Sequence, residues 1–330
     1  MKSAKNNQYN NPFQATIKGI SDLFKKHERV GELGSSERLD GKKVLITGSS
    51  SGLGYATTEQ LADLGATVIM ATRSGIPEKG NAIKEKTGSG NVYMHHVDLS
   101  SISSIHNLVA EIKETYTTID ILICNAAVVP KKSRKTADGL EEMFMVNFLA
   151  KFILINALLE ADCFNKNGNG IPRIIITSSE SHRNPKDFRW DEFGVYKEYG
   201  MGKTVELYGY YKLLLTTFLI ELSRRLNTGN KVNYSVFSLC PGPVNSNIAR
   251  EAPAIFQPLL KLTFSLFFRS PHKAAEPVVY LAASKDVEGK PLDYLFLMSR
   301  KAMDEKAMDA DNGKKLWGLS QELLTQDLIN

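Results

Sequence analysis

The chain has 330 residues, of which 42% are apolar and 23% charged, and its formal net charge is +5. This is the composition of an ordinary soluble globular protein with a sizeable core, and so modest a charge, spread along the chain, argues against a nucleic-acid partner. Its three cysteines have neither zinc-site nor disulfide-framework spacing, so we expect no metal site and a location in the reducing cytoplasm.

Residues 1–40 predict an N-terminal extension. Its first ten residues lack the apolar region of a signal peptide, and residues 13–26 predict a short amphipathic helix with lysines between its apolar positions. The apolar face of this helix consists of Phe13, Ile17, Ile20 and Phe24. No apolar run reaches the roughly 18 residues that span a bilayer, but this basic helix could rest on a membrane surface.

From residue 41 onward, apolar strand-like runs alternate with helix-like segments. The strand-like runs are 43–47, 67–72, 92–97, 120–124, 173–178 and 232–239, with 293–297 as a further candidate. The helix-like segments include 52–64, 101–116, 138–163 and 206–226. Buried strands that alternate with helices predict a mostly parallel sheet with helices on both faces. We therefore predict one doubly wound α/β domain over residues 41–330.

The first strand runs directly into a glycine-rich turn and then into a helix. Glycine lets the backbone turn tightly and approach a pyrophosphate closely, while the helix offers free N–H groups and the positive end of its dipole. Because the turn has this strand–helix context, it predicts dinucleotide binding of the Rossmann type rather than a simple loop. The residues expected to hold the cofactor here are Gly48, Ser50, Ser51, Gly52, Leu53 and Gly54.

Two charged residues follow the second and third strands. An NAD-preferring site usually has an acidic residue after the second strand, but this chain has Arg73, whose guanidinium suits a 2′-phosphate. We therefore predict that NADP(H) is preferred, with NAD(H) and a merely solvated arginine as alternatives. Asp98 is expected to accept a hydrogen bond from the adenine amino group; its alternative role is to cap the next helix.

Tyr208 and Lys212 are four residues apart in a helix-like segment and so share one face. A free phenol has a pKa of about 10, and we expect the lysine ammonium and the oxidised nicotinamide to lower the pKa of Tyr208. The tyrosine could then exchange a proton with an alcohol or carbonyl oxygen while hydride moves at carbon. Tyr210 and Tyr211 are rival phenols, but neither lies one helical turn before the lysine.

The strand at 173–178 ends in a serine pair that Glu180, Ser181 and His182 follow. A serine hydroxyl here could hydrogen-bond the substrate oxygen and stabilise the charge that develops on it. Nucleophilic catalysis with His182 as base is the alternative, but no G-x-S-x-G elbow surrounds the serines. We therefore expect His182 to be a pocket or turn residue.

With these motifs in this order, the chain resembles the short-chain dehydrogenase/reductase family over about residues 40–330, and within it the retinol dehydrogenase and WW-domain oxidoreductase group. The positions that match are the turn Thr47–Gly54, Asp98, Leu99, Asn125, Ala126, Asn147, Ser179, Tyr208, Lys212, Pro241 and Gly242. The cues for the group are Ser178–His182, Arg73 and the tail Leu316–Ser320. No WW module precedes the domain.

The resemblance implies a role for each matching residue. Tyr208 would be the general acid/base, Lys212 would bind the nicotinamide ribose and tune the tyrosine, and Ser179 would orient the substrate oxygen. Asn147 would hold a water in a proton relay. The remaining expected cofactor contacts are Leu99, Asn125, Ala126 and Ala127, and, beside the nicotinamide, Pro241, Gly242 and Val244.

Two positions depart from the family pattern. Ala127 stands where a glycine is usual and adds a methyl group near the expected adenosine ribose, so cofactor affinity would be altered. Gly209 directly follows the tyrosine, and we expect it to loosen that turn of the helix.

Residues 252–268 are dense in leucine and phenylalanine and fall in a predicted substrate lid at about 245–275. We expect this lid to cover a lipophilic alcohol or carbonyl substrate, so the prediction is an NADP(H)-dependent alcohol dehydrogenase or carbonyl reductase. Packing of a helix pair, or of two chains into a homodimer, is the alternative for the apolar segment. The alternatives for function are a catalytically weak regulatory or scaffolding protein of the same fold, and an epimerase or dehydratase acting on nucleotide sugars.

Overall fold

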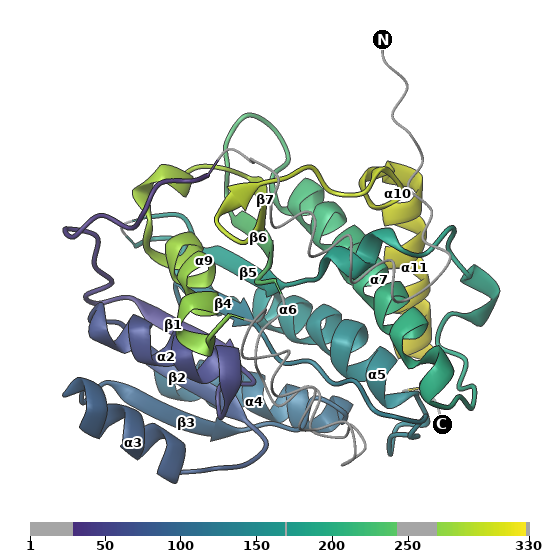
Figure 1. Cartoon of the computed structure of the whole chain (residues 1–330), viewed down its shortest axis with the longest axis horizontal. Helices are drawn as coiled ribbons and strands as arrows, with labels where there is room; N and C mark the ends of the chain where they lie inside the picture. The colour runs from purple at the N-terminus through teal and green to yellow at the C-terminus, as the bar shows by residue number, and fades with distance from the viewer. Residues whose placement is uncertain (1–28, 169, 243–268, 328–330) are drawn as a thin grey trace.

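The computed structural model describes residues 29–168, 170–242 and 269–327. One eight-stranded sheet runs through the middle of the molecule in the order β3-β2-β1-β4-β5-β6-β7-β8 (Figure 1). Neighbouring strands are parallel, except that β7 and β8 are antiparallel. The strands are β1 (Lys43–Thr47), β2 (Thr67–Thr72), β3 (Val92–His96), β4 (Ile121–Cys124), β5 (Arg173–Thr177), β6 (Ser235–Cys240), β7 (Leu292–Phe296) and β8 (Ser299–Arg300).

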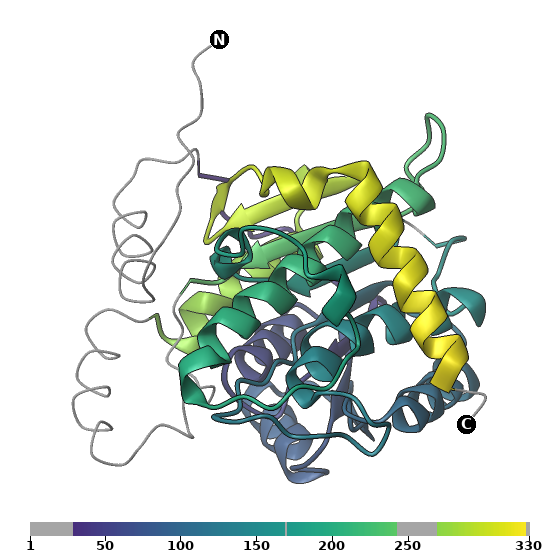
Figure 2. The same cartoon turned by 90° about the vertical axis from the view of Figure 1, so that its right-hand side faces the viewer.

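Helices cover both faces of this sheet. One face carries α2 (Gly52–Asp63), α3 (Glu78–Thr87) and α9 (Pro271–Ala283). The other carries α4 (Ile102–Tyr116), the continuous run of α5 (Glu142–Phe144), η1 (Met145–Leu149) and α6 (Ala150–Glu160), and α7 (Met201–Leu226). The helices α10 (Glu305–Met308) and α11 (Ala310–Asp327) pack along α7, where α11 forms the outermost layer (Figure 2).

The alternation of side chains along each strand explains this layering. In β1, Val44 and Ile46 are buried in the core beneath α2 and α9, whereas Leu45 is buried in the core beneath α4, α6 and α7. Successive side chains of a strand point to opposite faces, so an uninterrupted apolar strand needs a helical layer on each side. The prediction of a single doubly wound domain with a mostly parallel sheet is confirmed.

The element boundaries differ from the predicted ones in a few places. The candidate strand at 293–297 is β7, and the predicted strand at 232–239 begins only at Ser235. The helix predicted at 206–226 is α7, which begins five residues earlier. The helix predicted at 138–163 spans residues 142–160 and contains the π-helical turn η1. Hydrophobic periodicity in the sequence does not predict this turn.

The stretch Glu142–Glu160 is long and apolar enough to cross a membrane by length and composition alone, contrary to our expectation that no such run exists. However, 83% of its apolar window is buried inside the domain, against the sheet and α4. Its composition is therefore that of the central core helix of this fold.

Some predicted features lie outside the described residues: the helix at 13–26, Val244 and the apolar segment 252–268. Of the predicted lid at 245–275, residues 271–275 belong to the first turns of α9, which pack on α2. The described end of the predicted extension also contacts the domain. Val30 N–H donates to Met298 O at 2.8 Å, and Leu39 N–H donates to Leu64 O at 2.8 Å.

Candidate active site

A cavity of about 500 Å³ opens at the carboxyl ends of the parallel strands, beside β1 and β4, where the strand order reverses. This crevice is the usual ligand site of doubly wound sheets. Its walls include Gly48, Ser50–Gly54, Ala71–Ser74, Val97–Leu99, Asn125–Val129, Arg134, Glu142, Val146, Thr177–Ser179, Tyr208, Lys212 and Cys240–Gly242. Apart from Asn147 and the undescribed Val244, every sequence-predicted site residue lines this one cavity.

The glycine turn is pressed too closely against its neighbours to carry side chains. Gly48 has a φ of +66°, and a Cβ there would lie 2.7 Å from the Ala126 Cα. A Cβ on Gly54 would lie 2.3 Å from the Gly48 carbonyl oxygen. Asn125 holds the turn from the other side, because its Nδ2 donates to Gly48 O at 3.0 Å. Asn125, predicted to contact the cofactor, therefore also ties β1 to β4.

This turn has the features that a dinucleotide phosphate requires. The N-cap residue of α2, Ser51, makes no side-chain capping bond, and the first turn of the helix carries no acidic residue. Its N–H groups and its dipole thus favour an anion. The backbone at Gly48 and Gly54 leaves no room for a Cβ, and Arg73 lies exposed at the same cavity. The residues present therefore fit a nicotinamide dinucleotide.

Asp98 serves the turn before α4. Its Oδ1 accepts hydrogen bonds from Ser100 N–H at 2.9 Å and from the Ser100 hydroxyl at 2.6 Å. Burial acts to raise the pKa of Asp98, but these bonds and the charge of Arg73 outweigh it, and the pKa is lowered. One carboxylate oxygen therefore closes the turn before α4, but the N-cap of that helix is Ser101, so the alternative role of Asp98 as its cap is wrong. Asp98 still lines the cavity.

The two serines at the end of β5 point to different partners. The Ser178 hydroxyl is buried and shares a hydrogen bond with Thr216 Oγ1 of α7 at 2.9 Å. Ser179 Oγ instead accepts a hydrogen bond from the Ser181 hydroxyl at 2.9 Å, and the Ser179 side chain acts to lower the pKa of Tyr208. Of the pair, Ser179 is thus the serine next to the phenol, as the sequence predicted.

Lys212 is almost fully buried, and its Nζ donates to Thr177 O at 2.8 Å. The same Nζ lies 5.6 Å from the centre of the Tyr208 ring. Burial lowers the pKa of Lys212 to about 8. Thr177 Oγ1 is buried beside it without a hydrogen-bond partner in the described part of the chain. A donor or acceptor on a bound ligand could pair with it there.

Burial raises the pKa of Tyr208 and the neighbouring Cys240 adds to this effect, while the Ser179 side chain opposes them. Lys212 is not among the groups that lower this pKa, as we had expected it to be; lowering by an oxidised nicotinamide stays a prediction. The Lys212 ammonium is directed at a main-chain carbonyl rather than at the phenol oxygen. The spacing of four residues was a correct guide to proximity, but it carried no information on burial.

Asn147 lies in η1 and is fully buried. Its Oδ1 accepts from Val128 N–H at 2.8 Å, and its Nδ2 donates to Val128 O at 2.8 Å. Both ends of the amide therefore anchor the loop after β4. The side-chain amide therefore has a structural role, and a relay water held by Asn147 stays a prediction.

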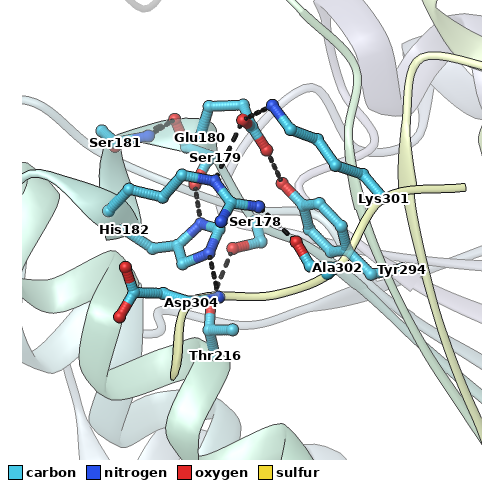
Figure 3. Close-up of polar contacts among 11 residues, drawn as sticks. Ser178, Ser179, Glu180, Ser181, His182, Thr216, Tyr294, Lys301, Ala302 and Asp304 are labelled. Atoms are coloured by element: carbon cyan, nitrogen blue, oxygen red, sulfur yellow. Dashed lines mark hydrogen bonds and ion pairs between the residues drawn. The ribbon is translucent and has the colours of Figure 1, made fainter. Parts of the chain in front are cut away.

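A partly buried ionic network fixes the serine loop to the C-terminal part of the domain (Figure 3). Glu180, in the short helix η2 (Glu180–Arg183), accepts hydrogen bonds from the Tyr294 hydroxyl at 2.6 Å and from Lys301 Nζ. Arg183 Nε also donates to it, at 3.1 Å. Burial acts to raise the pKa of Glu180, but the two cations outweigh it, so the pKa is lowered.

His182 completes this scaffold from the other side of η2. It is fully buried, its Nδ1 lies 2.7 Å from Ser179 O, and its Nε2 accepts from Asp304 N–H at 3.3 Å (Figure 3). Because a carbonyl only accepts, the proton is on Nδ1. Burial lowers the pKa of His182 to about 4. His182 is thus a neutral turn residue that holds the Ser179 backbone, and its geometry does not suit a nucleophile's base.

Gly209 allows α7 to approach this loop. A Cβ at Gly209 would lie 2.9 Å from Ser181 O, a closer approach than a side chain accepts. The glycine therefore lets the tyrosine helix pack directly on η2, next to Ser179 and Tyr208. We expected it to loosen the helix; its observed role is a close contact.

Sequence reasoning missed Lys151 and the Glu180 network. A signal for Lys151 was present, because it is the one charged residue in the apolar stretch 143–159, which was predicted to be a helix. The sequence carried no signal for the partners of Glu180, because one of them, Lys301, lies 121 residues away.

Residues 42–190 match the family model described as short chain dehydrogenase. The chain is similar to human retinol dehydrogenase 14, with 32% identity over 314 residues that cover 90% of each chain.

Two solved structures extend the comparison. A protein from Mycobacterium paratuberculosis described as putative and uncharacterized is similar, with a TM-score of 0.66 and 27% identity, covering 91% of this chain and 98% of that one. A short chain dehydrogenase from Burkholderia cenocepacia J2315 in complex with NADP has a TM-score of 0.58 and 22% identity, covering 79% and 97%. At that identity, the second likeness shows the fold alone.

Proposed function

Because the chain belongs to the short-chain dehydrogenase/reductase family, in the retinol dehydrogenase group, we propose that it is an NADP(H)-dependent oxidoreductase acting on a lipophilic alcohol or carbonyl compound. Membership of the family makes it an oxidoreductase with a nicotinamide cofactor. The preference for NADP(H), the substrate class and the roles of individual residues are what we add.

One observation carries the proposal: Ser179, Tyr208 and Lys212 line the same cavity as the glycine turn, and the Ser179 side chain lies close enough to the Tyr208 phenol to act on its pKa. A phenol and a hydroxyl side by side can both reach one substrate oxygen. The turn at β1 would hold the dinucleotide within the same space.

The chemistry then divides between cofactor and chain. When bound, the nicotinamide supplies or accepts the hydride at the substrate carbon. Tyr208, whose pKa is raised by burial, is protonated at neutral pH and donates its proton to a carbonyl oxygen during reduction. Ser179 orients that oxygen and stabilises the charge developing on it. In the oxidation direction the phenolate form of Tyr208 accepts the proton of the alcohol, and the positive charge of the oxidised nicotinamide would favour that phenolate.

Support for NADP(H) comes from Arg73. It follows β2, is exposed, and lines the cavity beside Ser74 and the end of the glycine turn. A guanidinium can bind a 2′-phosphate through two hydrogen bonds, whereas NAD(H) offers it only a hydroxyl.

Support for a lipophilic substrate comes from the apolar residues in the cavity wall, among them Val128, Val129 and Val146. Human retinol dehydrogenase 14, named for a lipophilic alcohol, is similar over most of its length. We extend that class of substrate, not retinol itself, to this chain.

We also keep a cytoplasmic location, contact of the N-terminal extension with a membrane surface and a homodimer as parts of the proposal. Flotation with liposomes of the full chain, compared with a chain lacking residues 1–38, tests the membrane contact. Loss of flotation on truncation supports that contact, and equal flotation of the two chains contradicts it.

The functional test follows oxidation of NADPH and of NADH in the presence of aldehydes, ketones, retinals and ketosteroids, with cofactor binding measured by calorimetry. We expect turnover with lipophilic carbonyl compounds and a preference for NADPH. Tight cofactor binding without turnover of any compound, in either direction, would instead favour the catalytically weak regulatory protein.

A further inference from the structure

One hydroxyl group at the active-site cavity has no partner among the described residues, and the proposed chemistry does not use it. Thr177 is the last residue of β5, is partly exposed and lines the cavity. Its Oγ1, however, is buried and makes no hydrogen bond within the described part of the chain. A buried hydroxyl without a partner costs free energy, so a threonine at this position needs an explanation.

The alternation of side chains along β5 sets the direction of this one. Ile176 belongs to the core beneath α4, α6 and α7, whereas Ile175 belongs to the core beneath α2 and α9. Successive side chains of a strand point to opposite faces, so Thr177 shares the face of Ile175. The next side chain, Ser178, points the other way and bonds to α7. Thr177 is therefore directed to the face of the sheet that carries the phosphate-binding helix α2.

The main chain around Thr177 is fixed on both sides. Its carbonyl oxygen accepts a hydrogen bond from Lys212 Nζ at 2.8 Å. Thr177 also pairs with Leu239 of β6 in the sheet, and the following Ser178 N–H donates to Leu239 O at 2.7 Å. Only the side chain of Thr177 is thus free to respond to a ligand.

A rotation of that side chain brings its hydroxyl to the cavity. Thr177 is partly exposed although its Oγ1 is not, so other atoms of the residue form the cavity wall. The methyl and hydroxyl groups of threonine are similar in size and occupy staggered positions about the Cα–Cβ bond. Exchange of the two positions therefore presents the hydroxyl to a ligand without movement of β5.

The place of Thr177 in the sheet selects the nicotinamide end of the cofactor as its partner. Arg73 and Asp98, expected at the adenosine end, follow β2 and β3, which β1 and β4 separate from β5. Thr177 instead carries the carbonyl that holds Lys212. The reactive ring of the cofactor has to lie beside the proposed proton donor, Tyr208. That ring bears a primary amide, which donates and accepts hydrogen bonds, as a hydroxyl does.

We propose that the Thr177 hydroxyl hydrogen-bonds the amide of the bound nicotinamide and so fixes the orientation of the ring at the end of β5. In the protein without cofactor the unpaired hydroxyl lowers stability. In the complex it is paired, and relief of this cost adds to the affinity. The inference rests on the proposed function, because it requires a nicotinamide cofactor in this cavity.

The first test measures the unfolding free energy of the full chain in denaturant, without cofactor. Thr177→Val keeps the shape of the side chain and removes only the unpaired hydroxyl, so it should be more stable than the wild type. Thr72→Val is the matched control. Thr72 also ends a strand and lines the cavity, but its hydroxyl donates to Ser74 O at 3.2 Å, so its loss should not stabilise the chain. The inference is overturned if Thr177→Val is no more stable than the wild type, or if Thr72→Val gains as much.

The second test measures binding by calorimetry, with NADPH and with 2′-phospho-ADP-ribose, which keeps both riboses and all the phosphates but lacks the nicotinamide. Thr177→Val should raise the Kd of NADPH about fivefold, which corresponds to about 1 kcal/mol. It should leave the Kd of 2′-phospho-ADP-ribose unchanged. Thr177→Ser retains a hydroxyl and should keep the wild-type Kd for both compounds.

Two results of the binding test would overturn the inference. One is a Kd of NADPH in Thr177→Val equal to that of the wild type. The other is equal weakening of both compounds, which would place the contact on a ribose or on the pyrophosphate. A threonine with a merely structural role would not combine higher stability of the free chain with weaker binding of NADPH alone.

Neither measurement requires turnover, so the inference and the proposed function can fail separately. The expected pattern of Kd values without turnover of any compound supports the contact and contradicts the proposed oxidoreductase activity. Turnover with unchanged Kd values in Thr177→Val overturns the contact and leaves the proposed function in place. If the wild type binds neither NADPH nor NADH, both are overturned.

Discussion

The two halves of the cavity are built in different ways. The cofactor half consists mainly of backbone: Gly48 and Gly54 pack so closely that no side chain fits, and the N-terminus of α2 faces the cavity. The proton-handling half consists of side chains, among them Tyr208 and Lys212, and is held by the partly buried network around Glu180. Shape defines the first half, whereas electrostatics and long-range contacts define the second.

This difference implies that the two halves can be damaged separately. Changes behind Ser179 should reduce turnover and leave cofactor affinity nearly intact, and changes at the cofactor half should do the reverse. A variant of the Glu180 network that weakened cofactor binding as much as turnover would contradict the claim that the two halves can be damaged separately.

The largest effect on stability is expected for Glu180→Ala. It leaves the Lys301 and Arg183 cations and the Tyr294 hydroxyl without their shared acceptor, and loss of an acceptor for such partly buried donors costs about 1–3 kcal/mol. Denaturant unfolding should show this loss, and kcat should fall with the cofactor Kd unchanged. The control is Glu192→Ala, because Glu192 also pairs with two cations but is exposed; it should cost less than about 1 kcal/mol.

For His182 we expect an effect on the free energy of unfolding that is of comparable size and depends on pH. Its pKa is lowered from 6.5 to about 4 in the folded state, so the unfolded chain binds the extra proton between these values. Stability must therefore fall as pH falls from about 6.5 to about 4, by about 3 kcal/mol from this one group.

The measurement compares unfolding free energies of the wild type and His182→Asn across that range. The asparagine amide can still donate to Ser179 O but does not titrate, so the difference between the two proteins isolates the histidine. Parallel curves for the two proteins would contradict the assignment of a buried neutral ring.

A smaller effect is expected from a pair of glycines in α7. Gly209→Ala places a methyl group against Ser181 O and should cost about 1–2 kcal/mol and reduce turnover by displacing η2. Gly202→Ala is the matched control, because a Cβ there meets nothing within 4 Å; higher helix propensity should make it neutral or stabilising by up to about 1 kcal/mol. Equal activity of the two variants would contradict the packing role that we assign to Gly209.

The smallest energetic effect is expected in the cofactor half. Arg73→Ala should reduce the preference for NADPH over NADH about tenfold, or about 1.4 kcal/mol, and leave kcat with saturating NADPH nearly unchanged. The control, Arg38→Ala, removes an exposed arginine that pairs with Asp40. A full preference for NADPH in Arg73→Ala would contradict the assignment of the 2′-phosphate.

Sequence reasoning was most informative for the cofactor half. Uninterrupted apolar runs give strands that are buried on both faces, and the glycines of the turn act locally, so both the sheet and the turn could be predicted from short segments. Ser179, Tyr208 and Lys212 could be placed in one site for the same reason, because Ser179 follows a recognisable strand and the other two share one face of a recognisable helix.

The electrostatics of the other half could not be predicted in this way. The pKa of Tyr208 depends on burial by several elements, and Asn147 turned out to bond the main chain of Val128. Glu180 and Tyr294 lie 114 residues apart and meet only because β5, β6 and β7 are neighbours. No local pattern encodes such contacts.

The central claim is that Tyr208 moves the proton, and substitution of its hydroxyl tests this most directly. We would measure kcat and cofactor Kd for Tyr208→Phe beside Tyr211→Phe, which removes a neighbouring phenol of the same helix. We predict that Tyr208→Phe lowers kcat by at least about 100-fold with cofactor Kd nearly unchanged, and that Tyr211→Phe remains active. Turnover of Tyr208→Phe close to that of the wild type would contradict the account.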